Sequence, residues 1–380
     1  MTSAGTNRSW DIFCSVVDNY GDVGVTWRLA RQLVAEHQLN VRLWIDDLSA
    51  FVRLCPGADS SAAQQWHAGV EVCSWPAVWQ ETRLPDVVLE AFACRLPAAY
   101  TDAMLHCSPR PVWLNLDYLS AEDWVTGCHG LPSMQSSGLK KIFFFPGFQP
   151  GTGGLLREQG LIEQRERFDQ DKSARLKALE ELGVRAVEGA RLISLFAYEN
   201  AGLGSWLDAL ATGPQPAHLL VPEGRVLGDV QAWLGADPLA VGAPQRRGAL
   251  TVQLLPFVGQ QDYDRLLWSC DFNVVRGEDS FVRAQWAARP MLWHIYQQED
   301  DAHLPKLDAF LHLYLAGLSP AAVEDLNRFW QAWNAQEPLG TSWQALNVHW
   351  PELDRHARDW CQRLALQTDL ATALVQFCRN

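Results

Sequence analysis

The chain has 380 residues, 48% of them hydrophobic, and a formal net charge of −13. This length is enough for two domains with sizeable cores, and the acidic balance argues against general binding to nucleic acid or anionic membranes, which needs a basic face. We expect a cytoplasmic protein with reduced thiols, because the nine cysteines include no C-x-x-C pair and because the chain has neither an apolar leader segment nor a run of about 18 apolar residues.

Short apolar segments alternate with helix-period segments along most of the chain. In the first half, the predicted strands cover residues 10–17, 41–45, 86–90, 112–116 and 140–145. Val25, Leu29 and Leu33 follow the first strand four residues apart, which predicts an amphipathic helix. This β-α-β pattern predicts a parallel sheet with helices on both faces.

The Gly- and Pro-rich stretch "PGFQPGTGGLLRE", residues 146–158, interrupts the alternation and is the expected domain boundary. The charged residues 163–181 then predict one solvated helix. Further predicted strands cover residues 191–196, 218–221, 251–255, 272–275 and 291–294. Beyond them the chain is predicted to be helical to its end, and the last helix covers residues 353–377.

These elements predict an α/β protein of two doubly wound, Rossmann-like domains that face a central crevice. The first domain is expected at residues 1–153 and the second at residues 154–354. Ligands of open α/β sheets bind at the carboxyl ends of the strands. We therefore expect the functional side chains in the loops that follow the strands.

The loop "VVDNYGDVGV", residues 16–25, follows the first strand and carries two carboxylates, Asp18 and Asp22. It lacks the G-x-G-x-x-G pattern, and its negative charges oppose a phosphate, so NAD or FAD binding is disfavoured here. Such a loop suits a cation or a group that donates hydrogen bonds. The alternative is that Asp22 only caps the following helix.

A second candidate site begins where the strand at residues 272–275 runs into Arg276 and Gly277. Asp279 or Ser280 could cap the next helix, whose N-terminus would favour an anion. Arg276 could bind a phosphate with two hydrogen bonds. The pattern indicates a nucleotide-diphosphate site, and the alternative is a capped helix with a solvated arginine.

Aromatic residues follow two other strands of the second domain. Phe196 and Tyr198 end one strand, and Phe257 and Gln260 follow another. Two rings around one site could hold a flat base, with Gln260 forming hydrogen bonds to its edge. The alternative is that these rings belong to the core.

Motifs for metal binding and hydrolysis are missing from the sequence. The ten histidines are dispersed, and His294 and His303 lack supporting ligands at suitable spacing. There is neither a G-x-S-x-G elbow nor a P-loop. We therefore expect a site that works without a metal ion.

The sequence resembles the protein-arginine rhamnosyltransferases that modify bacterial elongation factor P, over nearly its full length. The resemblance is carried by "WDIFCSVVDNYGDVGVTWRLARQL", "LEAFACRLP", "LLPFVGQ", "RGEDSFVRAQWAARPMLWHIY" and "QEDDAHLPKLDAFL". It implies a metal-independent GT-B glycosyltransferase that inverts the anomeric centre. The donor would be dTDP-β-L-rhamnose and the acceptor an arginine of elongation factor P, which then helps ribosomes stalled on polyproline.

The resemblance also implies roles for individual residues. Asp22 matches the proposed general base, and Asp18 and Glu278 match carboxylates that the family needs for activity. The positions that match the donor-nucleotide site are Phe196, Tyr198, Phe257, Gln260, Arg276, Gly277, Asp279 and Ser280. The acceptor loop would include Asn19, Tyr20 and Gly21. A C-terminal helix at about residues 355–380 would pack back on the first domain.

Two other functions share these features. A glycosyltransferase with a different protein or small-molecule acceptor would show the same motifs. A two-lobed binding protein without catalysis would also have twin α/β domains. Such binding proteins are usually exported, so the expected cytoplasmic location argues against that class.

Overall fold

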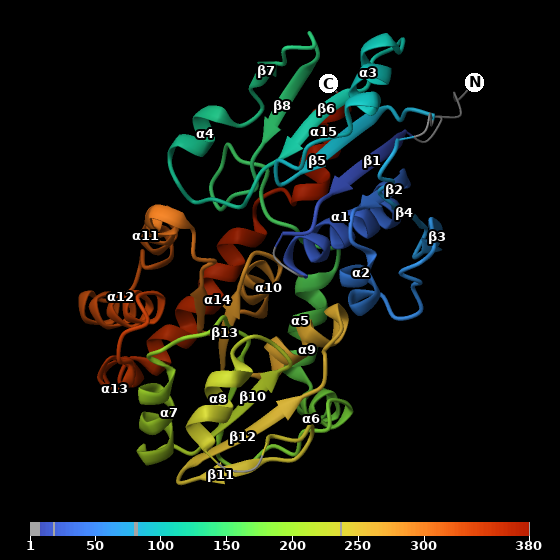
Figure 1. Cartoon of the computed structure of the whole chain (residues 1–380). Helices are drawn as coiled ribbons and strands as arrows, with labels where there is room; N and C mark the ends of the chain where they lie inside the picture. Colours follow the sequence, from blue (N-terminus) through green and yellow to red (C-terminus); the bar gives the residue numbers. More distant parts are fainter. Residues whose placement is uncertain (1–7, 18–19, 80–82, 236–237, 380) are drawn as a thin grey trace. The chain divides into compact units, whose positions relative to one another are not determined.

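The computed structural model describes residues 8–17, 20–79, 83–235 and 238–379 (Figure 1). The chain forms two compact units. Unit 1 comprises residues 1–159 and 367–380, and unit 2 comprises residues 160–366. Residues 154–159 were expected in the second domain but belong to unit 1. Residues 355–366 were expected on the first domain but belong to unit 2.

Within its described residues, unit 1 contains an eight-stranded sheet in the order β3-β4-β2-β1-β5-β6-β8-β7. The strands are β1 (Ser9–Cys14), β2 (Asn40–Ile45), β3 (Gln64–His67), β4 (Val70–Ser74), β5 (Val87–Ala91), β6 (Val112–Leu116), β7 (Pro132–Met134) and β8 (Lys140–Phe144). Strands β3 and β7 are antiparallel to their neighbours, and the other pairs are parallel. The five predicted strands are present, but the sheet is mixed because its two edges are antiparallel.

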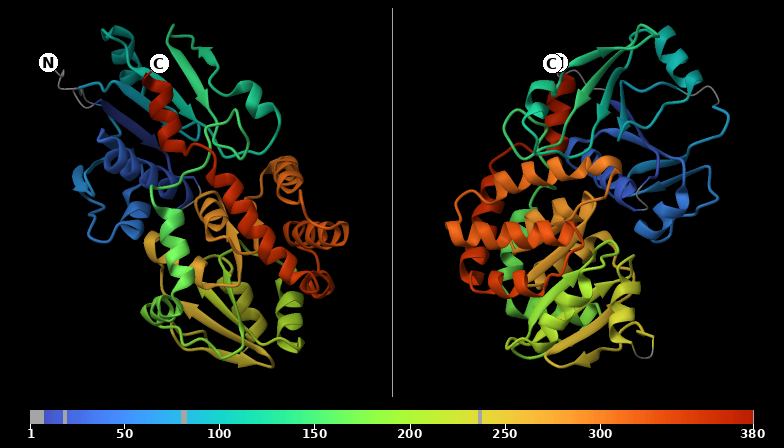
Figure 2. Two further views of the ribbon diagram at one scale, coloured as in Figure 1. Left: turned by 180° about the vertical axis from the view of Figure 1, so that it is seen from behind. Right: turned by 60° about the vertical axis from the view of Figure 1, so that its left-hand side comes forward.

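The helices of unit 1 are α1 (Gly21–His37), α2 (Leu48–Leu54), α3 (Ala98–His106), α4 (Trp124–Cys128) and α15 (Leu370–Arg379). Helix α1 buries Val25, Leu29 and Leu33, as their spacing predicts. Helix α15 contacts α1 and is the red helix beside the C label in Figure 2.

The segment before α15 is held closely against unit 1. The backbone N–H of Leu370 donates to the Leu155 carbonyl at 3.0 Å. Gly154 has φ +70°, and a Cβ there would lie 2.1 Å from the Thr368 carbonyl oxygen, so only glycine fits this approach. The single helix predicted at residues 353–377 is wrong. The chain forms α14 (Trp350–Ala365) in unit 2 and then α15, because Asp369 accepts the Thr372 backbone N–H and starts a new helix.

Within its described residues, unit 2 contains a six-stranded sheet in the order β11-β12-β10-β9-β13-β14. The strands are β9 (Arg191–Leu195), β10 (Ala217–Pro222), β11 (Gln245–Arg247), β12 (Leu250–Leu255), β13 (Phe272–Arg276) and β14 (Met291–His294). All pairs are parallel except β11 with β12. The five predicted strands coincide with β9, β10, β12, β13 and β14.

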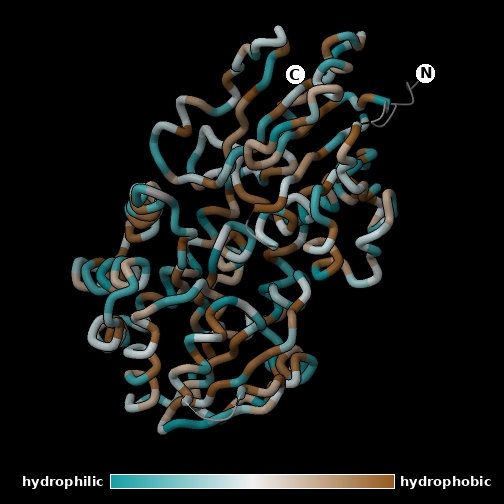
Figure 3. The backbone as a smooth tube through the Cα atoms, in the orientation of Figure 1, coloured by the Kyte–Doolittle hydropathy of each residue, from teal (hydrophilic) through white to brown (hydrophobic). Residues whose placement is uncertain are grey.

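Unit 2 carries most of the helices. They are α5 (Leu161–Gln170), α6 (Lys172–Glu181), α7 (Leu203–Thr212), α8 (Leu227–Leu234), α9 (Gln260–Ser269), α10 (Asp279–Ala287), α11 (His303–Tyr314), α12 (Pro320–Asn334), α13 (Gly340–Asn347) and α14, with a short 3-10 helix at Glu299–Asp301. In the described part of the chain, no helix combines the length and the apolar character needed to cross a membrane. The inner strands of both sheets are largely hydrophobic (Figure 3), and every residue of β10, β12 and β13 is buried.

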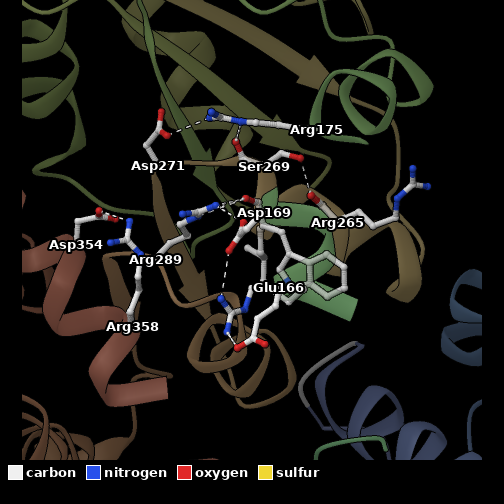
Figure 4. Close-up of polar contacts among 12 residues, drawn as sticks. Glu166, Asp169, Arg175, Arg265, Ser269, Asp271, Arg289, Asp354 and Arg358 are labelled. Atoms are coloured by element: carbon white, nitrogen blue, oxygen red, sulfur yellow. Dashed lines mark hydrogen bonds and ion pairs between the residues drawn. The ribbon is translucent and has the colours of Figure 1, made fainter. Parts of the chain in front are cut away.

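The charged segment at the start of unit 2 is two helices, not the single one predicted. The break lies at Asp171, whose side chain caps α6. Figure 4 shows the polar contacts between these two helices and the segments next to β13 and β14. Asp169 of α5 pairs with Arg289 at 2.5 Å, and Arg175 of α6 pairs with Asp271 at 3.0 Å. These ion pairs hold α5 and α6 to segments beside β13 and β14 of the same unit.

Candidate active site

Arg276, the last residue of β13, places a cation at the carboxyl end of the unit 2 sheet. Its guanidinium carbon lies 4.6 Å from the ring centre of Phe196 and 4.8 Å from that of Tyr198. Both rings follow β9, the strand next to β13. Contact with two aromatic faces fixes the plane of the guanidinium.

Arg276 is also buried, with 6% of its surface exposed. Its Nη1 atom has no hydrogen-bond partner among the described residues. A buried donor without a partner costs about 1–3 kcal/mol, so an acceptor that reaches this nitrogen is strongly favoured. Oxygen atoms of a phosphate group meet that requirement.

The turn after β13 positions the start of α10. Gly277 has φ +57°, a left-handed conformation that glycine adopts without strain. The N-cap residue of α10 is Glu278, so the expectation that Asp279 or Ser280 is the cap is wrong. The Ser280 hydroxyl instead donates to the Arg276 carbonyl and accepts the Arg276 backbone N–H at 3.0 Å. Ser280 therefore fixes the backbone from which the Arg276 side chain extends.

Gln260 and Asp279 connect two helix starts at this end of the sheet. Gln260 is the first residue of α9 and Asp279 the first of α10. The Gln260 Nε2 donates to Asp279 Oδ2 at 3.1 Å. Phe257 is half-buried in the loop before α9, so it is not a core residue. The structure thus places the predicted donor-site residues of unit 2 at or just after the carboxyl ends of β9, β12 and β13.

Three residues that the sequence did not assign to the donor site lie beside these groups. The Arg225 guanidinium carbon is 5.4 Å from the Tyr198 ring centre, and its Nε lies 2.9 Å from a carboxylate oxygen of Glu199. His294 is the last residue of β14, and its ring centre is 5.3 Å from that of Tyr198. All three follow or end predicted strands, which is the one sequence signal that could have found them.

His294 carries no positive charge at neutral pH. Burial, and secondly the positive charge of Arg276, lower its pKa to about 3. Arg276 therefore lies next to an uncharged imidazole and not next to a second cation. The site keeps one buried positive group, to which an anion can bind.

In unit 1, Asp22 is the second residue of α1 and is 5% exposed. Its Oδ2 accepts the backbone N–H of Val17 at 2.9 Å. The N-cap of α1 is Tyr20, so the alternative that Asp22 is the N-cap is wrong. Tyr20 and Gly21 are half-buried at the start of this helix. Two other predicted residues of this loop, Asp18 and Asn19, lie outside the described residues.

Metal ligands do not gather in the part of the chain that the structure describes. No group of three or more His, Cys, Asp or Glu residues there is placed to hold a metal ion. The ring of His303 instead accepts the backbone N–H of Gln298 at 3.2 Å.

Two α/β units, each built on a largely parallel sheet, are the architecture of the GT-B glycosyltransferases. A UDP-glucosyltransferase from Polygonum tinctorium shares this fold at 12% identity, with a TM-score of 0.53 and 98% of both chains covered. Residues 10–379 match the family model of the elongation-factor P (EF-P) rhamnosyltransferase EarP, and the chain belongs to this family.

Individual relatives agree with this assignment. The chain is 64% identical to a protein-arginine rhamnosyltransferase of Pseudomonas putida, with 98% of this chain and 99% of the relative covered. It is 58% identical to that of Pseudomonas aeruginosa, with 97% and 98% covered. A solved structure on EarP-mediated arginine glycosylation of translation elongation factor EF-P is 50% identical, covers 98% of this chain and 99% of its own, and has a TM-score of 0.71.

Proposed function

We propose that this chain transfers L-rhamnose from dTDP-β-L-rhamnose to an arginine side chain of elongation factor P, with inversion at the anomeric carbon. Family membership supports the acceptor and the sugar. The observation that carries the donor site is the Arg276 guanidinium, buried against Phe196 and Tyr198, with one nitrogen that lacks a hydrogen-bond partner among the described residues. The reaction would take place in the cytoplasm and prepare the factor to rescue ribosomes stalled on polyproline.

Unit 2 would bind the donor. Arg276 and the N-terminus of α10 would stabilise the negative charge that develops on dTDP as the bond from the sugar to the β-phosphate oxygen breaks. Phe257 would stack on thymine, and Gln260 would form a hydrogen bond near the nucleoside. Ser280 supports this arrangement by holding the backbone of Arg276. Arg276 and the N-terminus of α10 would thus neutralise the diphosphate, which a metal ion does in many nucleotide-sugar enzymes.

Unit 1 would supply the base. A guanidinium has a pKa above about 12 and no free lone pair, so a carboxylate of pKa about 4 cannot deprotonate it before reaction. Proton transfer must accompany or follow formation of the C–N bond, when the substituted nitrogen becomes more acidic. Asp22 would hold the attacking nitrogen and accept that proton late. Asp18 or Glu278 would orient the guanidinium and weaken its planar delocalisation.

The direct test is to incubate the chain with elongation factor P and dTDP-β-L-rhamnose, then weigh the factor by mass spectrometry. The proposal predicts a mass increase of one deoxyhexose, located on an arginine by fragmentation. A factor in which that arginine is replaced by lysine is the matched control and should stay unmodified. Transfer to another acceptor, with elongation factor P unchanged, would contradict the proposed acceptor.

A further inference from the structure

We propose that His294 is a further donor-binding residue, whose ring N–H donates a hydrogen bond to an oxygen of the bound diphosphate next to the oxygen that Arg276 binds. This inference rests on the proposed function, because it places the donor diphosphate at Arg276. It adds a residue from a fourth strand, β14, to the loops already described.

His294 and Arg276 lie side by side at the end of the sheet. Arg276 and His294 are the last residues of neighbouring parallel strands and lie opposite each other in the register. Residues paired in this way direct their side chains to the same face of the sheet. Both therefore lie at the carboxyl end of the sheet, where ligands of open α/β folds bind. The Tyr198 ring contacts both side chains.

The hydrogen-bonding groups of the His294 ring also indicate a ligand. His294 is only 1% exposed, and neither of its ring nitrogens has a hydrogen-bond partner among the described residues. The same holds for Nη1 of Arg276. A buried donor that lacks an acceptor is destabilising. Two adjacent residues with this deficit would be satisfied together by one diphosphate, which carries several acceptor oxygens.

The backbone and ring of His294 are held in place by neighbouring residues. The Asn334 side chain accepts the backbone N–H of Ile295 at 3.0 Å and donates to the carbonyl of Trp293 at 3.0 Å. The chain is therefore fixed on both sides of His294. The ring itself packs between Tyr198 and Trp333, whose ring centre is 6.2 Å away. The ring is therefore held in one orientation, which lowers the entropy that it would lose on binding a ligand.

The charge of the ring fits this role. Burial and the nearby Arg276 lower the pKa of His294, as do Arg225 and His303, whereas Glu199 raises it. The ring is thus uncharged at pH 7, with one nitrogen protonated and the other free to accept. It can add a hydrogen bond to a phosphate without placing a second positive charge beside Arg276.

The test compares variants of the full chain by calorimetric titration with dTDP. His294→Phe keeps a flat ring but removes both nitrogens, whereas His294→Asn and His294→Gln restore an N–H near one nitrogen or the other. A hydrogen bond to a charged group contributes about 1.5–3 kcal/mol, so we expect His294→Phe to weaken dTDP binding about 10- to 150-fold. At least one amide variant should recover part of that loss. Binding of thymidine, which has no phosphate, should be unchanged.

His218→Phe is the matched control, because His218 is equally buried but lies near the amino end of β10. Its dTDP affinity should equal that of the wild type. The inference is overturned if folded His294→Phe binds dTDP like the wild type, or if all three His294 variants lose affinity equally. If His294→Phe does not fold, His294→Asn and His294→Gln provide the test. The inference is then overturned if these variants lose thymidine binding as much as they lose dTDP binding. Absence of dTDP binding by the wild type would instead refute the proposed donor.

Discussion

The guanidinium carbon of Arg276 lies 4.8 Å from the ring centre of Tyr198, and the ring of Phe196 lies 4.6 Å from the same carbon. These two rings follow β9, whereas Arg276 ends β13, so the contact exists only because the two strands are neighbours in the sheet. The arrangement orients the guanidinium plane, which a flexible ammonium group in the same place would not reproduce.

Arg276→Lys should therefore weaken dTDP binding although it keeps the charge. Lysine cannot stack on both rings or bind a phosphate with two parallel hydrogen bonds. We expect a loss of about 10- to 100-fold, the scale of one or two charge-assisted hydrogen bonds. Calorimetric titration measures the affinity for dTDP, and Arg328→Lys, on an exposed helix face, is the control. Unchanged affinity in Arg276→Lys would show that the phosphate is bound elsewhere.

Phe257→Ala should affect the ligand more than the fold. Phe257 is half-buried in a loop, so its removal leaves no large core cavity. Loss of stacking on thymine should weaken dTDP binding about 10- to 100-fold, since stacking of a base on an aromatic ring contributes roughly 1–3 kcal/mol. A large drop in melting temperature with normal dTDP affinity would assign this ring to the core instead.

The stability of the chain should fall as pH is lowered from about 6.5. The pKa of His294 is about 3 in the fold against about 6.5 in the unfolded chain, so the unfolded state binds the proton first. Burial also lowers the pKa values of His218 and His356, which act in the same direction.

His294→Phe should reduce this pH dependence. Between pH 6.5 and 4 the wild type should lose up to about 1.4 kcal/mol per pH unit more than the variant, because one proton fewer is linked to unfolding. Melting temperatures measured across this range test the difference. Equal slopes for both proteins would mean that the His294 ring is not held uncharged in the folded state.

Removal of metal ions should leave transfer unaffected. Arg276 and the N-terminus of α10 can neutralise a leaving diphosphate without a cation. Dialysis against EDTA should leave the rate of rhamnosylation within experimental error of the untreated enzyme. A loss of activity that Mg²⁺ restores would contradict this description of the donor site.

The main strands of both sheets were predictable because each is a short apolar segment between helix-period segments. The strands β3, β4, β7 and β11 were not predicted. Two of them, with the sequences "QQWH" and "PSM", are edge strands whose short, partly polar sequences carry little alternation. The last helix was predicted as continuous because its apolar anchors, Trp360, Leu364, Leu374 and Phe377, extend along the whole segment, but Asp369 begins a second helix.

The strand-end loops of the site were also predictable, because ligands of α/β sheets bind at the carboxyl ends of strands. The role of His294 was not, since a single histidine at the end of an apolar strand has no spacing pattern. Its relation to Arg276 arises from the register of β13 and β14, which the sequence does not display. The bond from Asp22 back to Val17, in place of an N-cap, likewise depends on how the loop folds.

The most direct test of the mechanism is the rate of rhamnosylation by Asp22→Asn, measured together with its dTDP-β-L-rhamnose affinity and melting temperature. The asparagine amide oxygen can still accept the Val17 N–H, so the loop should stay anchored, but the basic oxygen and the charge are lost. The account predicts a rate at least about 10²-fold lower, the lower scale of general-base catalysis, with donor affinity and melting temperature unchanged because the donor residues lie in unit 2. A rate close to that of the wild type would contradict the role of Asp22 as proton acceptor.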